Sequence, residues 1–238
     1  MPPTIWLADL TYDQQTISSD VMPAAVGCIA TYAEKWVRSK PNIRIFKFPK
    51  TLAEALKTET PDVIGFSNYC WNEDISTQFA RVIKMKRPQV ITVFGGPNYP
   101  VELLEQEAFL RHYPMIDFYI VKEGEVAFAK LIEALEVCNF KKDLVPEDLP
   151  SVHRISADGR FCVAPTMARL TDLGEIPSPY LTGKMDCFFD GVMLPIIQTN
   201  RGCPFKCTFC IEGMDYYSKV AKNKGPEKGI RGAGVYCC

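Results

Sequence analysis

Two hydrophobic patterns divide the chain. Up to Val137, short apolar runs alternate with longer segments in which apolar residues recur at helical spacing. The runs predict strands and the periodic segments predict helices. The expected strands are Thr4–Ala8, Ile43–Phe48, Val63–Ser67, Val90–Phe94 and Phe118–Val121. The expected helices are Pro23–Ser39, Thr51–Lys57 with Thr51 as its cap, a helix capped by Asp74, Glu102–Arg111 and Glu125–Val137.

The expected strands are apolar throughout, which is typical of a parallel sheet covered by helices on both faces. We therefore predict an α/β fold for residues 1–137, with a doubly wound, flavodoxin-like (Rossmann-like) parallel sheet. Such a sheet binds its ligand beyond the carboxyl ends of its strands. The loops expected at that edge are Leu10–Met22, Asn68–Glu73, Gly95–Pro100 and Lys122–Glu125.

Two of these loops differ from ordinary connections. Leu10–Met22, which contains Gln14, is long for a link between a strand and a helix. Gly95 and Gly96 permit positive φ and would let a ligand approach the backbone closely, although a simple tight turn explains them equally well.

The alternation stops after Val137. Residues 138–192 are predicted to be a linker with a β-hairpin around Ala157–Gly159, because Asp-Gly is a hairpin turn signal. Met193–Thr199 predicts a new strand that leads into a cysteine-rich loop. We expect residues 193–238 to begin a second domain.

The charge balance argues against several classes of partner. With 27 basic and 28 acidic residues, the net charge of −1 offers no overall attraction to nucleic acid or to an anionic membrane. Val21–Ala33 is uncharged but too short to cross a bilayer, and the N-terminus has no secretory signal. We expect a cytoplasmic protein without nucleic-acid or membrane partners.

Ten cysteines are a high number for such a chain, and their distribution separates them into groups. Five stand singly and are expected to be small residues of the core. Two end the chain. The single ones are Cys28, Cys70, Cys138, Cys162 and Cys187, and the remaining three, Cys203, Cys207 and Cys210, are bunched.

The bunched cysteines form a C-x₃-C-x₂-C pattern in a loop after a predicted strand. Three thiolates on one short loop suit an iron–sulfur cubane that keeps one iron open for another ligand. Structural zinc prefers four ligands in paired C-x₂-C units, which the x₃ gap fits poorly. A fourth ligand from Cys237 or Cys238 keeps zinc as the alternative.

The run from Gln198 to Cys210 resembles the signature of radical S-adenosylmethionine enzymes, C-x₃-C-x-aromatic-C after the first barrel strand. The resemblance implies that Cys203, Cys207 and Cys210 bind a 4Fe-4S cluster and that Phe209 packs near S-adenosylmethionine. It also implies radical chemistry that begins with one electron from a donor such as a flavodoxin or ferredoxin.

The first 137 residues are similar to the cobalamin-binding domain that precedes the radical domain in one branch of that superfamily. The resemblance rests on four matching segments. It implies methyl transfer or related radical chemistry with cobalamin as a further cofactor. The matching segments are Pro23–Tyr32, Pro61–Ser67, Val93–Pro97 and Ile116–Glu125. The cobalamin contacts implied at the carboxyl edge are Gln14, Ser67, Asn68, Gly95, Gly96, Glu123 and Gly124.

Two departures from the family pattern concern cobalamin. The D-x-H-x-x-G signature is absent, and the two histidines, His112 and His153, lie in no matching loop and are expected at the surface. The motif after the fifth strand usually reads G-E-G-E, and here Lys122 replaces its first glycine. Simpler alternatives also stay open, because Ser67, Asn68 and Tyr69 could simply end a strand, and Glu123 and Glu125 could belong to an acidic first helical turn.

The length limits what this chain can do alone. Cys210 is followed by 28 of the 238 residues, whereas each further strand–helix–strand unit of the radical domain needs ~30 residues. We expect the N-terminal part of a radical S-adenosylmethionine enzyme of unknown substrate, with an incomplete βα barrel and no turnover on its own. The alternative is a non-catalytic cobalamin-binding or scaffold module with a vestigial cysteine loop.

Overall fold

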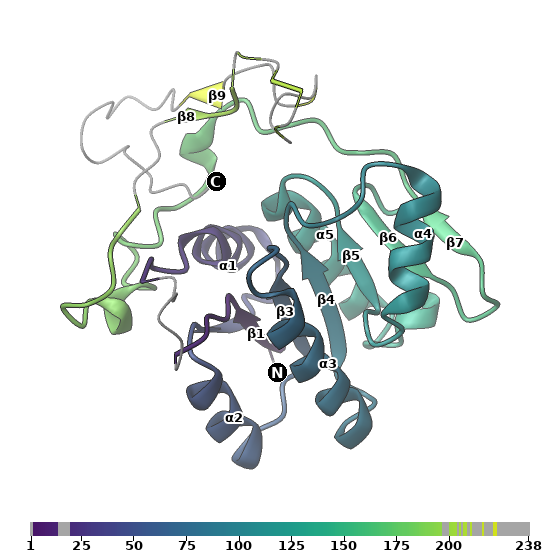
Figure 1. The fold of residues 1–238 in the computed structure, drawn as a ribbon, viewed down its shortest axis with the longest axis horizontal. Coiled ribbons are helices and arrows are strands. Elements are labelled where there is room, and N and C mark those ends of the chain that lie inside the picture. The colour runs from purple at the N-terminus through teal and green to yellow at the C-terminus, as the bar shows by residue number, and fades with distance from the viewer. Residues whose placement is uncertain are drawn as a thin grey trace. The chain divides into compact units, whose positions relative to one another are not determined.

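The computed structural model (Figure 1) describes residues 2–13, 20–196, 200–203, 205, 207–208, 210, 216 and 221–222. Its residues group into two compact units, 1–19 with 33–167 and 20–32 with 168–238. The larger unit contains the strands β1 (Thr4–Ala8), β2 (Asn42–Phe46), β3 (Val63–Ser67), β4 (Ile91–Gly95), β5 (Phe118–Ile120), β6 (Val152–Ile155) and β7 (Phe161–Val163). The helices are α1 (Ala24–Trp36), whose residues are divided between the units, α2 (Pro49–Thr58), α3 (Glu73–Lys86), α4 (Leu103–His112) and α5 (Gly124–Val137), with the 3-10 turn η1 (Lys142–Leu144).

The strands of the larger unit form one sheet in the order β2-β1-β3-β4-β5-β6-β7. The first five strands of this order are parallel, which is the flavodoxin-like arrangement and confirms the predicted fold class. Ser67 pairs with Gly95, and Gly95 pairs with Ile120, so the carboxyl ends of β3, β4 and β5 lie level.

Both faces of the sheet are covered, as the apolar strands require. On one face, side chains such as Trp6, Ile64 and Phe94 share a core with residues of α2, α3 and α4. On the other face, a Cβ added to Gly65 would come within 3.9 Å of Phe128 on α5. Burial on both faces explains why these strands do not alternate polar with apolar residues.

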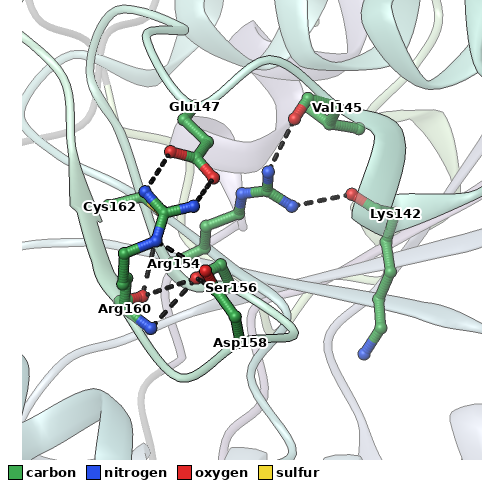
Figure 2. Close-up of polar contacts among 8 residues, drawn as sticks. All are labelled: Lys142, Val145, Glu147, Arg154, Ser156, Asp158, Arg160 and Cys162. Atoms are coloured by element: carbon green, nitrogen blue, oxygen red, sulfur yellow. Dashed lines mark hydrogen bonds and ion pairs between the residues drawn. The ribbon is translucent and has the colours of Figure 1, made fainter.

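The hairpin that the sequence assigns to the linker extends this sheet. β6 pairs antiparallel with β5, and β7 pairs with β6. The turn has Gly159 at φ +83°, as an Asp-Gly hairpin predicts. Figure 2 shows how the hairpin is fastened: the buried Arg154 donates to the carbonyls of Lys142 and Val145 at 2.8 and 2.6 Å. Arg160 pairs with Glu147 and Asp158 at the surface.

Three helices begin earlier than the sequence pattern predicts: α5 by a single residue, at Gly124, and α2 and α3 by more. α2 starts at Pro49, and Thr51 is not its cap, since the Thr51 hydroxyl donates back to the Phe48 carbonyl at 2.8 Å. Proline suits the first helical turn because it lacks an N–H to satisfy. α3 starts at Glu73 after Asn72, so Asp74 lies inside its first turn and is not the cap.

A buried carboxylate joins the amino-terminal edge of the sheet to two lysines. Asp117 accepts a hydrogen bond from the Thr92 N–H at 2.8 Å and pairs with Lys84 and, at 2.5 Å, with Lys142. Its side chain is 1 % exposed. Burial lowers the pKa of Lys84, and the charge of Asp117 opposes this effect.

The smaller unit packs the start of α1 against the connector that follows the hairpin. The Thr31 hydroxyl donates to the Pro177 carbonyl at 2.7 Å, and a Cβ on Gly27 would lie 2.5 Å from Met185. This unit also contains the 3-10 turns η2 (Leu173–Glu175) and η3 (Asp186–Phe188), and the short strands β8 (Asn200–Arg201) and β9 (Ala221–Lys222).

The strand predicted at Met193–Thr199 is wrong in its described part. Up to residue 196, only Leu194 makes a β-bridge, to Val21, and residues 197–199 lie outside the described chain. Pro195 follows Leu194 immediately and has no N–H for a ladder. The first strand after this point is β8, which pairs antiparallel with β9. Among the described residues, we find no helix with the length and apolarity to cross a bilayer.

Candidate functional site

The carboxyl ends of β1 and β3 carry a connected set of polar side chains. Asp9, directly after β1, pairs with Lys47 at 2.9 Å and accepts a hydrogen bond from the Ser67 hydroxyl at 2.5 Å. The Asn72 amide donates to the same hydroxyl at 2.9 Å. The Ser67 hydroxyl is therefore engaged within the protein. The sequence analysis did not single out Asp9, Lys47 or Asn72, although Asp9 marks the point where an apolar run ends in a carboxylate.

Asn68 links the ends of β3, β4 and β5. Its side-chain amide donates to the Asn98 carbonyl at 2.7 Å and to the Tyr119 hydroxyl at 3.1 Å. Its backbone N–H donates to the Gly95 carbonyl at 2.7 Å. The side-chain oxygen of Asn68 is buried and accepts no hydrogen bond from the described residues. Gln106 and Glu136 also have a buried side-chain oxygen without a donor in the described chain, and Asn68 is the one of these three residues that directly follows a strand of the sheet. Such an oxygen can accept a hydrogen bond from a bound ligand.

The glycine pair at the end of β4 is explained first by the protein's own packing. Gly96 has φ +137°, and a Cβ there would lie 2.4 Å from the backbone oxygen of Asn68. The Tyr119 hydroxyl donates to the Gly96 carbonyl at 3.1 Å. A Cβ on Gly95 would meet Ile120 at 3.4 Å. The close approach that the sequence predicted for a ligand is made here by residue 68 of the chain itself.

The loop after β5 turns into α5 within three residues. Lys122 has φ +70°, which is unusual for any residue other than glycine. Glu123 is the N-cap of α5, and Gly124 begins the helix. Glu125 is buried. A glycine at this position would adopt the left-handed backbone without strain.

A flat aromatic surface lies beside Asn68. The rings of Tyr69 and Trp71 stack with centroids 4.4 Å apart and planes 8° apart. Trp71 is 54 % exposed, which is high for a residue of its size. The sequence analysis counted Tyr69 with the strand end and passed over Trp71, because a single tryptophan in a loop gives no periodic signal.

A buried stack of two tyrosines lies next to the carboxyl edge of the sheet. Tyr99 and Tyr119 stack at 3.9 Å, and the Tyr99 hydroxyl lies 3.4 Å from Nδ1 of His153. Burial raises the pKa of both tyrosines and lowers the pKa of His153 to about 4. The expectation that His153 lies at the surface is therefore wrong, whereas His112 is exposed at the end of α4. His153 is buried because it lies in β6 directly opposite Tyr119 of β5.

The structure agrees with some of the predictions for the cysteines and contradicts others. Cys203, Cys207 and Cys210 carry free thiols, the first half-buried and the others exposed. Across the described residues, no group of three His, Cys, Asp or Glu side chains is arranged to hold a metal ion. Phe209, Gln14, Cys237 and Cys238 lie outside the described residues. Of the single cysteines, Cys28 and Cys162 are buried as expected; the expectation is wrong for Cys138, which is half-buried, and for Cys70 and Cys187, which are exposed.

Comparison with known proteins identifies the sheet domain. The B12 binding domain family model matches residues 13–132. The chain belongs to the B12 binding domain family. It is 32 % identical over 212 residues to the cobalamin-dependent radical SAM methyltransferase TokK of Streptomyces tokunonensis, which covers 84 % of this chain and 30 % of TokK. It is also 32 % identical over 206 residues to 2-(S-pantetheinyl)-carbapenam-3-carboxylate methyltransferase of Streptantibioticus cattleyicolor, covering 79 % of this chain and 28 % of that protein.

A solved structure agrees with this B12 binding domain assignment at the level of the fold. The cobalamin-dependent S-adenosylmethionine radical enzyme OxsB, with aqua-cobalamin and S-adenosylmethionine bound, superposes with a TM-score of 0.66 and 18 % identity. The match covers 93 % of this chain and 30 % of OxsB. The chain is thus homologous to the N-terminal part of cobalamin-dependent radical S-adenosylmethionine methyltransferases and spans about 30 % of the length of these relatives.

The carboxyl edge of this B12 binding domain has chemistry that fits a corrinoid. A corrin ring is a flat macrocycle whose peripheral amides carry N–H donors. The exposed face of Trp71 offers a flat apolar surface, and the buried oxygen of Asn68 lacks a donor. The three free thiols fit an iron–sulfur cluster by their ligand type alone.

Proposed function

We propose that this chain binds cobalamin at the carboxyl edge of its parallel sheet, within a radical S-adenosylmethionine methyltransferase. The observation that carries the proposal is the match of the B12 binding domain to residues 13–132, a range that includes the buried, donor-free oxygen of Asn68. A corrin amide supplies the type of donor that this oxygen lacks. Cobalamin brings the methyl-carrying cobalt, and the protein holds and shields it.

Histidine does not ligate the cobalt in this proposal. His112 is exposed at the far end of α4, and His153 is buried in β6 against Tyr99. The contact surface in this proposal is instead the stacked pair of Tyr69 and Trp71, which follows Asn68. Stacking on an exposed aromatic ring requires no charge and matches the flat shape of the ligand.

The cysteine loop extends the proposal to a second cofactor. Cys203, Cys207 and Cys210 would ligate a 4Fe-4S cluster, and Phe209 would pack near S-adenosylmethionine. Support comes from the spacing of the motif and from the homology to radical S-adenosylmethionine methyltransferases. In this scheme, the substrate is a further small molecule of unknown identity. A flavodoxin or ferredoxin supplies the electron that reduces the cluster.

Cobalamin binding is tested by mixing the chain with hydroxocobalamin and recording corrin absorbance after gel filtration. The wild-type chain should retain about one corrinoid per chain. Trp71→Ala should weaken retention by about tenfold in Kd, since stacking of this kind contributes ~1 kcal/mol or more. Trp36→Ala, at a half-exposed tryptophan at the end of α1, is the matched control and should retain the corrinoid. A wild-type chain that retains none overturns the proposal.

Cluster binding is tested by anaerobic reconstitution. The chain should take up about four irons and four sulfides, and Cys207→Ala should lose them. Cys187→Ala is the control, because Cys187 is an exposed free thiol outside the motif. Uptake of zinc in place of iron contradicts the enzyme proposal.

A non-catalytic corrinoid-binding module is the second candidate. The observation in its favour is that, in the part of the chain that the structure describes, no three ligands are arranged for a metal. Retained corrin absorbance together with failed cluster assembly would favour this candidate over the enzyme.

A further inference from the structure

In the described chain, Lys122 is one of five non-glycine residues with a left-handed backbone. Asn139 and Phe140 follow the end of α5, where this conformation commonly closes the last turn, whereas Lys40 lies in the turn after α1 and Ser151 (φ +60°) directly precedes β6. Lys122 (φ +70°) precedes a helix instead. Helix capping therefore does not account for its conformation, and a glycine would adopt it without strain.

The neighbours of Lys122 place it at the carboxyl edge of the sheet. Ile120 pairs with Gly95, and the Val121 N–H donates to the Ser151 carbonyl at 2.9 Å, which fixes the chain immediately before Lys122. The next strand end along the sheet carries Gly96 and, beyond it, Asn68 with its donor-free oxygen. A strained residue held at the edge where a ligand binds is a candidate for function.

The side chain adds a chemical argument. Lys122 is half-buried, and loss of solvent lowers the pKa of its ammonium group. A partly desolvated ammonium gains more from a neighbouring anion than an exposed one does. The peripheral side chains of a corrin ring are neutral amides, so the phosphodiester of the nucleotide loop is the one peripheral anion that cobalamin presents.

We propose that Lys122 binds the phosphodiester of the cobalamin nucleotide loop and thereby selects complete cobalamin over cobinamide, which lacks that loop. The inference rests on the proposed cobalamin binding. A compact ammonium with three donors suits a phosphate oxygen, and a charge-assisted hydrogen bond of this kind corresponds to about tenfold in affinity. In this proposal the lysine has a role that glycine could not fill, because only the lysine carries a charge for the phosphate.

The test titrates the full chain with hydroxocobalamin and with aquocobinamide and follows corrin absorbance. The wild-type chain should bind cobalamin about tenfold more tightly than cobinamide. Lys122→Gln should lose this preference by weakening cobalamin binding alone, and Lys122→Arg should keep most of it. Lys122→Gly should lose the preference as well and raise the thermal midpoint of the unliganded chain, because it relieves the left-handed strain.

Each contrary outcome has a definite meaning. If the wild-type chain binds neither corrinoid, both the proposed function and this inference fail. If it binds both, and Lys122→Gln changes both affinities equally or neither, cobalamin binding stands and the role of Lys122 is overturned. A thermal midpoint that rises in Lys122→Gly with the preference intact also overturns it, because the strain would then serve no recognition.

Discussion

Asp117 shows how much can depend on one buried carboxylate. It accepts the Thr92 N–H and pairs with Lys84 and Lys142, which come from separate elements. Asp117→Asn removes the charge and leaves Lys84 in a partly desolvated site without its partner. We expect the free energy of unfolding to fall by about 3 kcal/mol, as measured by urea denaturation.

The matched control is Asp158→Asn, which breaks the exposed pair with Arg160 in the hairpin. The hydrogen bonds of Ser156 and Arg160 hold the pKa of Asp158 down to about 2, but the group is fully exposed to solvent. Its loss should leave the urea midpoint unchanged within error. Equal destabilisation by both variants would mean that burial of Asp117 is not what matters.

His153 makes the stability depend on pH. Burial lowers the pKa of His153 to about 4, whereas an unfolded histidine titrates near 6.5. Between these values the unfolded chain binds the proton and the folded chain does not. The contribution of neutral, buried His153 to the free energy of unfolding is therefore present above about pH 6.5 and is lost as the pH falls toward 4.

Urea denaturation across this pH window should detect uptake of up to about one proton on unfolding. His153→Gln should flatten the dependence, and His112→Gln, at the exposed histidine, should leave it unchanged. An unchanged slope in His153→Gln would show that another group is responsible.

At the scale of elements, the loops after β3 and β4 hold one another in place. A Cβ on Gly96 would lie 2.4 Å from the backbone oxygen of Asn68, and the φ of +137° disfavours any side chain at this position. Gly96→Ala should therefore cost about 2 kcal/mol or more of unfolding free energy and weaken corrinoid binding. Thermal denaturation with and without hydroxocobalamin measures both effects.

Gly159→Ala separates the cost of the positive φ from the cost of the steric contact with Asn68. Gly159 also has positive φ, but nothing lies within 4 Å of its Cβ position in the exposed hairpin turn. Its substitution should cost only the conformational part, about 1 kcal/mol, and leave corrinoid binding intact. If both alanine variants cost the same, the contact with Asn68 is not tight in solution.

The elements were predictable where burial dictated the sequence pattern. Val63–Ser67 is buried on both faces, so its residues had to be apolar or small and the run was visible. Helix starts were less predictable, because Asn72 and Asp74 are equally good N-cap residues by type. The structure places the start after Asn72, whose side-chain oxygen accepts a hydrogen bond from the Tyr69 N–H in the preceding turn. His153 and the exposed Cys70 were misjudged because single residues carry no periodic signal.

For the candidate site, the sequence predicted the edge of the sheet but not its internal bonding. Ser67 and Asn68 do lie at that edge, as strand topology requires. Their partners Asp9 and Tyr119 come from distant parts of the chain, as does Lys47, which pairs with Asp9, and no local pattern connects them. Long-range polar networks of this kind become visible only when the strands are in register.

At the scale of the whole molecule, the two proposed cofactor sites should act independently on stability. Hydroxocobalamin at a hundredfold of its Kd should raise the free energy of unfolding by about 2.7 kcal/mol, since it binds only the folded chain. Cys207→Ala should show the same increase, because the proposed corrinoid site lies at the ends of β3, β4 and β5, away in sequence from the cysteine loop. A smaller increase in that variant would mean that the cysteine loop contributes to cobalamin binding.

The bonds that join Asn68 to its neighbours have a further consequence for the thermodynamics of binding. The bonds from the Asn68 N–H to Gly95, from the Asn98 N–H to Asn68 and from the Tyr119 hydroxyl to Gly96 join groups of the chain itself. They fix the floor of the proposed site, so a corrinoid that binds there would not have to order this backbone. Little conformational entropy is lost at this floor on association, so more of the contact energy remains as affinity.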